Sequence, residues 1–195
     1  DLKYNKNVIL LDGVRDTLGA TLKMLGYSLN TTNPDEINEA KEKLIELKKN
    51  GNLLAIGADD NTDKMARGEA AISILWSGEG LNLEAEHDNL KFVVPKEGAN
   101  FWIDSLCIPK GTKNKENAEL FINYLCEKDP SFRTADEIGY TTPQKEAREE
   151  QDDNVKNNPN AYMDDELLKK CESYNYLGDN LRLYEDAWTQ FKDYQ

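Results

Sequence analysis

The stretch NVILLDGVRDTLGATLKML, residues 7–25, predicts the fold class of this chain. The apolar run that ends at Leu11 is followed by Asp12-Gly13, a pattern typical of a buried strand that leads into a turn. From Arg15 to Leu25, leucine recurs at helical spacing until Gly26 ends the pattern. A short buried strand followed directly by an amphipathic helix is the repeating unit of α/β folds with a parallel sheet.

The same alternation continues along the chain. Asn33-Pro34-Asp35-Glu36 combines an N-cap residue, a proline at the first helical position and early acidic residues, so it predicts a helix to about Asn50. Further strands are predicted at Leu53–Ile56, Ala71–Leu75, Lys91–Val94 and Phe101–Pro109, and further helices near 63–67, 115–126, 130–137, 164–171 and 181–192. We therefore expect an α/β fold, with a mainly parallel sheet flanked by helices.

The run FWIDSLCIP, residues 101–109, places a carboxylate inside an apolar segment. In a strand, Trp102 and Asp104 would point to one face while Ile103 and Ser105 point to the other. A charge among apolar side chains is costly unless it is paired, so Asp104 is predicted to face a cation. A structural ion pair would satisfy it equally well, and the strand pattern alone leaves both interpretations open.

The other candidate binding residues are also carboxylates and aromatics. Asp12 and Trp76 follow predicted strands, and ligands of open α/β sheets sit at the carboxyl ends of strands. Asp16 lies near the start of the first helix, where helix capping is the alternative role, and Tyr140 follows Gly139 in a turn. Such a set suits a flexible organic polycation, because carboxylates neutralise ammonium groups and ring faces attract them.

The overall charge agrees with a cationic ligand. The 195 residues carry a formal net charge of −13 at pH 7, with 24 Lys and Arg against 37 Asp and Glu. No basic stripe could displace counterions from phosphate, so nucleic acid is not expected as a partner. The electric field of an acidic surface also attracts small cations, although a net negative charge can serve solubility alone.

Catalysis, metal binding and cofactor binding are not expected. One histidine and no nucleophile elbow leave no catalytic pairing, and the three cysteines contain no CxxC pair. The run Asp59–Asp63 matches the start of a calcium loop, but Lys64 stands where the loop needs glycine and Ala70 where it needs glutamate. The sequence also shows no apolar run long enough to span a bilayer and no export signal.

Five stretches resemble the spermidine/putrescine-binding proteins of bacterial polyamine ABC importers, a group of periplasmic binding proteins. They are residues 25–32 (LGYSLNTT), 94–98 (VPKEG), 101–109, 114–125 (NKENAELFINYL) and 138–143 (IGYTTP). The match extends over nearly all of the chain and keeps the order of these motifs. The resemblance implies a two-lobed protein that closes on a polyamine and delivers it to a membrane permease, at the periplasmic or extracellular face of the bacterial membrane.

The resemblance also implies roles for individual residues. Trp102 and Asp104 match the pair that holds one amine, Trp76 and Tyr140 match other aromatic contacts, and Asp16 matches an acidic residue near a second amine. Where the family has another acidic residue, this chain has Gly13, which leaves Asp12 as the substitute. The implied ligand contacts are therefore Trp102, Asp104, Trp76, Tyr140, Asp16 and Asp12, in an acidic and aromatic cleft.

The family resemblance further implies that residues 1–94 and 149–195 form the second lobe, and that residues 95–148 belong to the first lobe, whose remainder lies outside this chain. An incomplete lobe could pair with a second copy, so a homo-oligomer is a further expectation. Two alternatives remain open: a protein of the same fold for a different small solute, and an interaction domain without a ligand.

Overall fold

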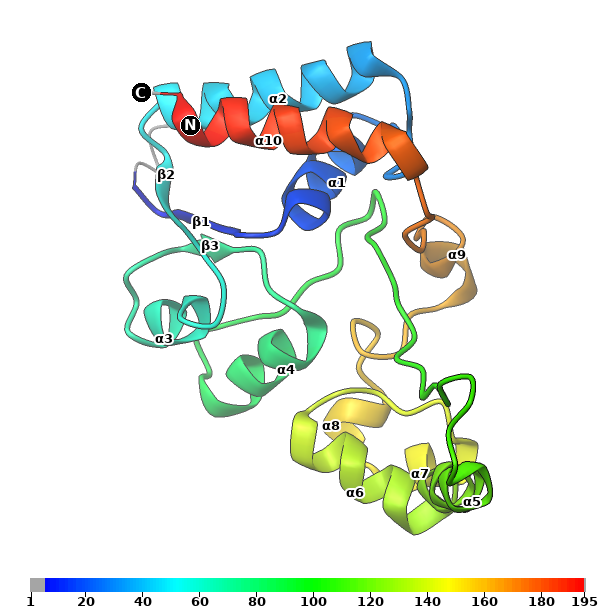
Figure 1. Ribbon diagram of the computed structural model, residues 1–195. Helices are drawn as coiled ribbons and strands as arrows, with labels where there is room; N and C mark the ends of the chain where they lie inside the picture. The colour runs from blue at the N-terminus through cyan, green and yellow to red at the C-terminus, as the bar shows by residue number, and fades with distance from the viewer. Residues whose placement is uncertain (1–5, 195) are drawn as a thin grey trace. The chain divides into compact units, whose positions relative to one another are not determined.

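Three short parallel strands form the sheet of this structure, a computed structural model that describes residues 6–194 (Figure 1). The strands are β1 (Val8–Leu11), β2 (Leu53–Gly57) and β3 (Ile72–Ser73), in the order β2-β1-β3. β1 is central and pairs in parallel with both neighbours. The predicted α/β fold with a parallel sheet is confirmed.

Three helices cover the buried side of β1. They are α1 (Val14–Met24), α2 (Pro34–Lys49) and α10 (Leu181–Asp193), and Figure 1 shows α10 running beside α2. Leu10, Leu18 and Leu22 are buried in the same apolar cluster as Tyr184 and Phe191 of α10. The core therefore joins the first strand of the chain to its last helix.

The long helices begin and end where the sequence predicts. The Asn33 side chain caps α2 by accepting a hydrogen bond from the amide of Asp35 at 3.0 Å, and Pro34 occupies the first turn. Tyr184, Ala187, Trp188 and Phe191 are buried along one stripe of α10. Periodic apolar positions and a capping residue thus sufficed to predict these two elements.

The chain divides into two compact units, which are described separately below. Unit 1 consists of three stretches, which are the chain up to Trp76, Val93–Trp102 and the chain from Asp165 onward. Unit 2 consists of Ser77–Phe92 and Ile103–Asp164. Besides the elements already named, unit 1 contains α3 (Asn61–Ala66), α9 (Asp165–Leu168) and the 3-10 helix η2 (Gly178–Asn180). Unit 2 contains α4 (Ser77–Glu86), α5 (Lys115–Leu125), α6 (Lys128–Ile138), α7 (Lys145–Glu150) and α8 (Asp153–Lys156). The division of residues 1–94, 95–148 and 149–195 between two lobes of a longer protein stays a prediction.

Two of the predicted strands are wrong. Residues 91–94 and 101–109 lie in no strand, and Asn100 makes only an isolated parallel bridge with Glu172. The amide of Phe101 donates to the carbonyl of Glu172 at 3.0 Å, after which this pairing stops. The alternation of faces expected for Trp102 and Asp104 therefore does not apply, because a run of apolar residues becomes a strand only beside a neighbour that pairs with it.

The segment Gly78-Glu79-Gly80, predicted as a turn, lies inside α4. Both glycines are buried, and a Cβ at Gly78 would come within 2.2 Å of the Tyr140 ring. A Cβ at Gly80 would come equally close to the Phe92 ring. The two glycines thus allow aromatic rings to pack closely against α4. A Gly-X-Gly sequence is equally typical of a turn, so the sequence alone does not distinguish the two structures.

Within residues 6–194, no helix is both long and apolar enough to cross a membrane.

Candidate functional site

The carboxyl ends of the strands bring Asp12 and Trp76 to one edge of the sheet in unit 1. β1 and β3 are parallel and pair Ile9 with Ser73. The amide of Ile74 bonds the carbonyl of Ile9 at 3.1 Å. Asp12 comes directly after β1, and Trp76 follows the end of β3 by three residues. Both residues thus follow strand ends, where α/β sheets bind ligands.

Asp12 already holds a cation from its own chain. The ammonium of Lys192, in α10, lies 3.0 Å and 3.2 Å from the two carboxylate oxygens of Asp12. Each side chain of this pair is 43% exposed. An exposed pair of this kind contributes about 0 to 1 kcal/mol, so an incoming ammonium group could displace Lys192 at small cost.

Asp16 lies in the first turn of α1 and is held by a residue far along the chain. The hydroxyl of Tyr174 donates a hydrogen bond to Asp16 Oδ1 at 3.2 Å. Asp16 Oδ2 lies only 2.3 Å from the position that a Cβ on Gly13 would take. Gly13, the N-cap of α1, has no side chain to offer, so the absence of a Cβ there makes room for the Asp16 carboxylate.

The guanidinium of Arg15 contacts two tyrosine rings and two residues that follow α1 in the sequence. It lies over two tyrosine rings, 4.7 Å from the centroid of Tyr174 and 4.8 Å from that of Tyr184. It also donates to the carbonyl of Leu29 and to Asn30 Oδ1, each at 2.9 Å. The arginine thus supports the aromatic residues around Asp16.

Tyr140 and Asp104 belong to unit 2, where Tyr140 packs on α4. Its ring lies against Gly78, and burial is the main cause that raises the pKa of its phenol. The negative charges of Glu79 and then Asp104 raise that pKa further, while a hydrogen bond with the Gly78 backbone opposes the shift. Tyr140 therefore stays a neutral phenol in an acidic environment, as a hydrogen-bond partner for an ammonium group should.

Trp102 is the last residue of one stretch of unit 1, and Asp104 lies near the start of a stretch of unit 2. Trp102 is 40% exposed and Asp104 is exposed. Four predicted contact residues therefore belong to unit 1 (Asp12, Asp16, Trp76 and Trp102) and two to unit 2 (Asp104 and Tyr140). The role of each as a ligand contact stays a prediction.

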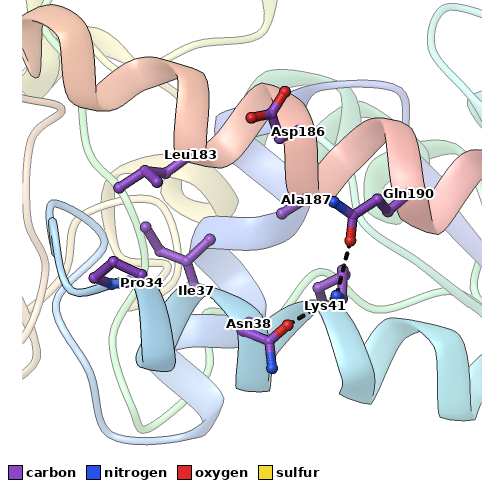
Figure 2. Close-up of a pocket in the computed structure, with 8 residues that line it drawn as sticks. All are labelled: Pro34, Ile37, Asn38, Lys41, Leu183, Asp186, Ala187 and Gln190. Atoms are coloured by element: carbon purple, nitrogen blue, oxygen red, sulfur yellow. Dashed lines mark hydrogen bonds between the residues drawn. The ribbon is translucent and has the colours of Figure 1, made fainter.

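A separate groove lies between α2 and α10 (Figure 2). At one end, Lys41 donates a hydrogen bond to Gln190 at 2.9 Å and another to Asn38 at 2.8 Å. The groove is lined by Pro34, Ile37, Asn38, Lys41, Leu183, Asp186, Ala187 and Gln190. None of the six predicted contact residues lines it.

Across residues 6–194, no three His, Cys, Asp or Glu side chains gather as metal ligands would.

Sequence reasoning missed Tyr174 and Lys192, which contact two of the predicted carboxylates. Tyr174 contacts Asp16 across 158 residues of sequence, and Lys192 contacts Asp12 across 180. The pair of tyrosines at Tyr174 and Tyr176, in a loop before the last helix, was the available signal, because aromatics in loops are often exposed for binding. Nothing in the sequence indicated which carboxylate each residue would contact.

Comparison with known proteins identifies one family. The family model described as bacterial extracellular solute-binding protein matches residues 2–163. Among curated proteins, the spermidine/putrescine-binding periplasmic protein of Salmonella typhimurium is 36% identical over 190 residues, covering 97% of this chain and 54% of the relative. The protein of the same name from Escherichia coli is 35% identical with the same coverage. This chain spans about half the length of the curated relatives it matches.

Solved structures agree with this result. A spermidine/putrescine ABC transporter protein of Listeria monocytogenes superimposes with a TM-score of 0.89 at 33% identity. The spermidine/putrescine ABC transporter substrate-binding protein PotD of Streptococcus pneumoniae gives a TM-score of 0.89 at 35% identity. In both comparisons the match covers 100% of this chain and 60% of the solved chain.

Proposed function

This chain belongs to the family of bacterial extracellular solute-binding proteins, and from that membership we propose that it is part of a polyamine-binding protein of an ABC importer. The observation that carries the proposal is the 35–36% identity, over 97% of the chain, to proteins named for binding spermidine and putrescine. The family resemblance expected from five stretches of sequence is thus confirmed. The proposed ligand class is a spermidine-like or putrescine-like polyamine.

The residue chemistry supports a polyamine as the ligand. The proposed contacts are Trp102, Asp104, Trp76, Tyr140, Asp16 and Asp12. Carboxylates would pair with the ammonium groups, and each cation over a ring would add about 0.5 to 2 kcal/mol. Burying roughly seven methylenes of a triamine at about 0.8 kcal/mol each would contribute on the order of 5 kcal/mol. Micromolar affinity is reachable after ordering costs.

We propose that the partner is a membrane permease and that binding takes place at the periplasmic or extracellular face of the bacterial membrane. Relatives named as periplasmic binding proteins support this location. A binding role without catalysis is consistent with the same names, since the relatives are described as binding proteins. The acidic chain, with a net charge of −13, would also attract a cationic solute from a distance.

We propose further that residues 95–148 are a segment of a first lobe and that residues 1–94 and 149–195 form a second lobe. The exposed apolar side chains of α5 support this. Leu120, Phe121 and Tyr124 are 68%, 58% and 53% exposed, and no residue of α5 is buried. Exposed apolar side chains of this kind are usually buried against another surface. That surface would be the rest of the lobe or a second copy of this chain.

Isothermal titration calorimetry with putrescine, spermidine and spermine tests the proposed ligand class. We expect the 195-residue chain to bind at least one of them, and a full-length relative serves as the positive control. Binding by the relative but not by this chain would show that the residues outside the chain are required. Absence of binding by the natural full-length protein that contains this chain would refute the polyamine assignment.

One observation favours a second candidate, a solute other than a polyamine. Lys192 occupies both oxygens of Asp12, so one proposed acidic contact already has an ammonium partner. A solute with its own carboxylate could bind Lys192 in place of Asp12. Parallel titrations with an amino acid and a dicarboxylate decide between the two candidates, because a polyamine-specific site binds neither.

A further inference from the structure

Asp16 is the proposed contact residue with the most elaborate support in the structure. Its Oδ1 accepts the hydrogen bond from Tyr174 at 3.2 Å. Its Oδ2 occupies the space left by the missing Cβ of Gly13, 2.3 Å from where that atom would be. Two independent features, one hydroxyl and one glycine, therefore fix the direction of this carboxylate.

The side chain of Asn30 fixes the backbone on both sides of Tyr174. The Asn30 side-chain amide donates to the carbonyl of Ser173 at 2.9 Å, and its Oδ1 accepts from the amide of Asn175 at 2.8 Å. The same Oδ1 accepts from Arg15 at 2.9 Å. One asparagine thus fixes the residues immediately before and after Tyr174 and links them to the arginine.

The ring of Tyr174 is fixed as well. Arg15 lies 4.7 Å from the centroid of this ring and 4.8 Å from that of Tyr184, so its guanidinium holds two aromatic rings together. Tyr184 is fully buried, and its hydroxyl lies 3.1 Å and 2.8 Å from the carbonyls of Leu29 and Thr31. The tyrosine that contacts Asp16 is therefore anchored to the core of unit 1.

We propose that Tyr174 is a positioning residue, which orients the Asp16 carboxylate for the ammonium group of a polyamine. The inference rests on the proposed function and names a residue that acts through Asp16. A carboxylate fixed before binding loses less rotamer entropy when the ligand arrives, so the hydrogen bond from Tyr174 increases affinity without touching the ligand.

The hydroxyl of Tyr174 keeps its proton over the physiological pH range. Burial raises the pKa of this phenol far above its usual value, and the negative charge of Asp16 and the hydrogen bond to it raise the pKa further. The positive charge of Arg15 opposes the shift. Tyr174 can therefore donate to Asp16 at every pH at which the protein would work.

The test compares Tyr174→Phe with Tyr176→Phe. Removing the Tyr174 hydroxyl keeps the ring that stacks on Arg15, so the unfolding temperature should change little. Polyamine affinity should fall roughly three- to tenfold, the range expected for one lost hydrogen bond. Tyr176 is 97% exposed, so Tyr176→Phe should leave affinity unchanged. Unchanged affinity in Tyr174→Phe would overturn the proposal.

A double-mutant cycle with Asp16→Asn separates positioning from a general structural effect. If Tyr174 acts through Asp16, the double variant should bind no more weakly than Asp16→Asn alone. Fully additive losses in affinity would contradict the proposal, because Tyr174 would then act by another route.

A measurement without ligand distinguishes failure of this inference from failure of the proposed function. In proton NMR, the hydrogen-bonded Tyr174 hydroxyl should give a slowly exchanging signal that is lost in Tyr174→Phe and kept in Tyr176→Phe. Asp16→Asn should shift or abolish that signal. If the natural full-length protein that contains this chain binds no polyamine but the chain shows this behaviour, the proposed function fails while the contact between Tyr174 and Asp16 stands. A signal unaffected by Asp16→Asn overturns the inference itself.

Discussion

At the scale of single residues, Asp104 offers the most direct test of the proposed polyamine site. Asp104→Asn should weaken polyamine binding by roughly tenfold or more, because an ammonium group that is partly removed from water loses its counter-charge. Calorimetry measures the change. Asp136→Asn, another exposed aspartate of unit 2, should leave affinity unchanged. Equal affinity in Asp104→Asn and the unmodified chain would remove Asp104 from the set of contacts.

A substitution at Lys192 should have the opposite effect on polyamine affinity. Because its ammonium occupies both oxygens of Asp12, Lys192→Met should free that carboxylate and strengthen polyamine binding about two- to fivefold at low salt. The gain should shrink as salt rises. Lys169, paired with Glu166 in α9, supplies the control variant Lys169→Met. A loss of affinity in Lys192→Met would show that Asp12 is not a ligand contact.

At the scale of elements, α4 positions Tyr140 through a glycine. Gly78→Ala should push the Tyr140 ring away, since the added Cβ would lie 2.2 Å from it, and polyamine affinity should fall several-fold. Gly80→Ala introduces an equally close contact with Phe92 and serves as the matched control. If both variants lower affinity alike at equal unfolding temperature, the effect belongs to α4 packing in general and not to Tyr140.

The pairing of α1 with the segment around Glu172 gives a pH-dependent prediction. Burial opposes the ionised form of Glu172, but hydrogen bonds from Lys23 at 2.8 Å and from Ser28 outweigh it and hold the pKa of this carboxyl below its usual value. A depressed carboxyl pKa stabilises the folded state above the unfolded pKa of about 4.3, and this stabilisation is lost as pH falls through the folded pKa.

The unfolding temperature should therefore fall more steeply between about pH 5 and pH 3 in the unmodified chain than in Glu172→Gln. Thermal unfolding followed by circular dichroism measures both slopes. Glu166→Gln, whose side chain is 82% exposed, should behave as the unmodified chain does. Parallel slopes in Glu172→Gln and the unmodified chain would contradict the role of this ion pair.

The elements also show what the sequence could predict. The helices α2 and α10 were predicted because their apolar periodicity and, in α2, the cap at Asn33 are local signals. The strand at 101–109 was wrong because strand formation depends on a neighbour that sequence periodicity does not report. In the site, Asp12 and Trp76 could be placed at strand ends from local patterns. The contact of Tyr174 with Asp16 could not, since it joins residues 158 positions apart.

At the scale of the whole molecule, the α5 face predicts self-association. Leu120, Phe121 and Tyr124 are exposed on one helix, so the chain should form dimers or larger species in analytical ultracentrifugation as its concentration rises. Leu120→Ser combined with Phe121→Ser should shift it to monomers. Glu119→Ser on the same helix provides the control, because it removes no apolar surface. A chain that stays monomeric at high micromolar concentration would contradict this expectation.

The packing of α10 on α1 and α2 has a consequence for biosynthesis. Since α10 follows every other element of unit 1 in the sequence, the apolar faces of α1 and α2 stay uncovered while the ribosome translates the intervening residues. Chaperones that recognise apolar segments can therefore engage these faces while the residues between α2 and α10 are translated. Native packing of unit 1 is completed after α10 has left the ribosomal tunnel.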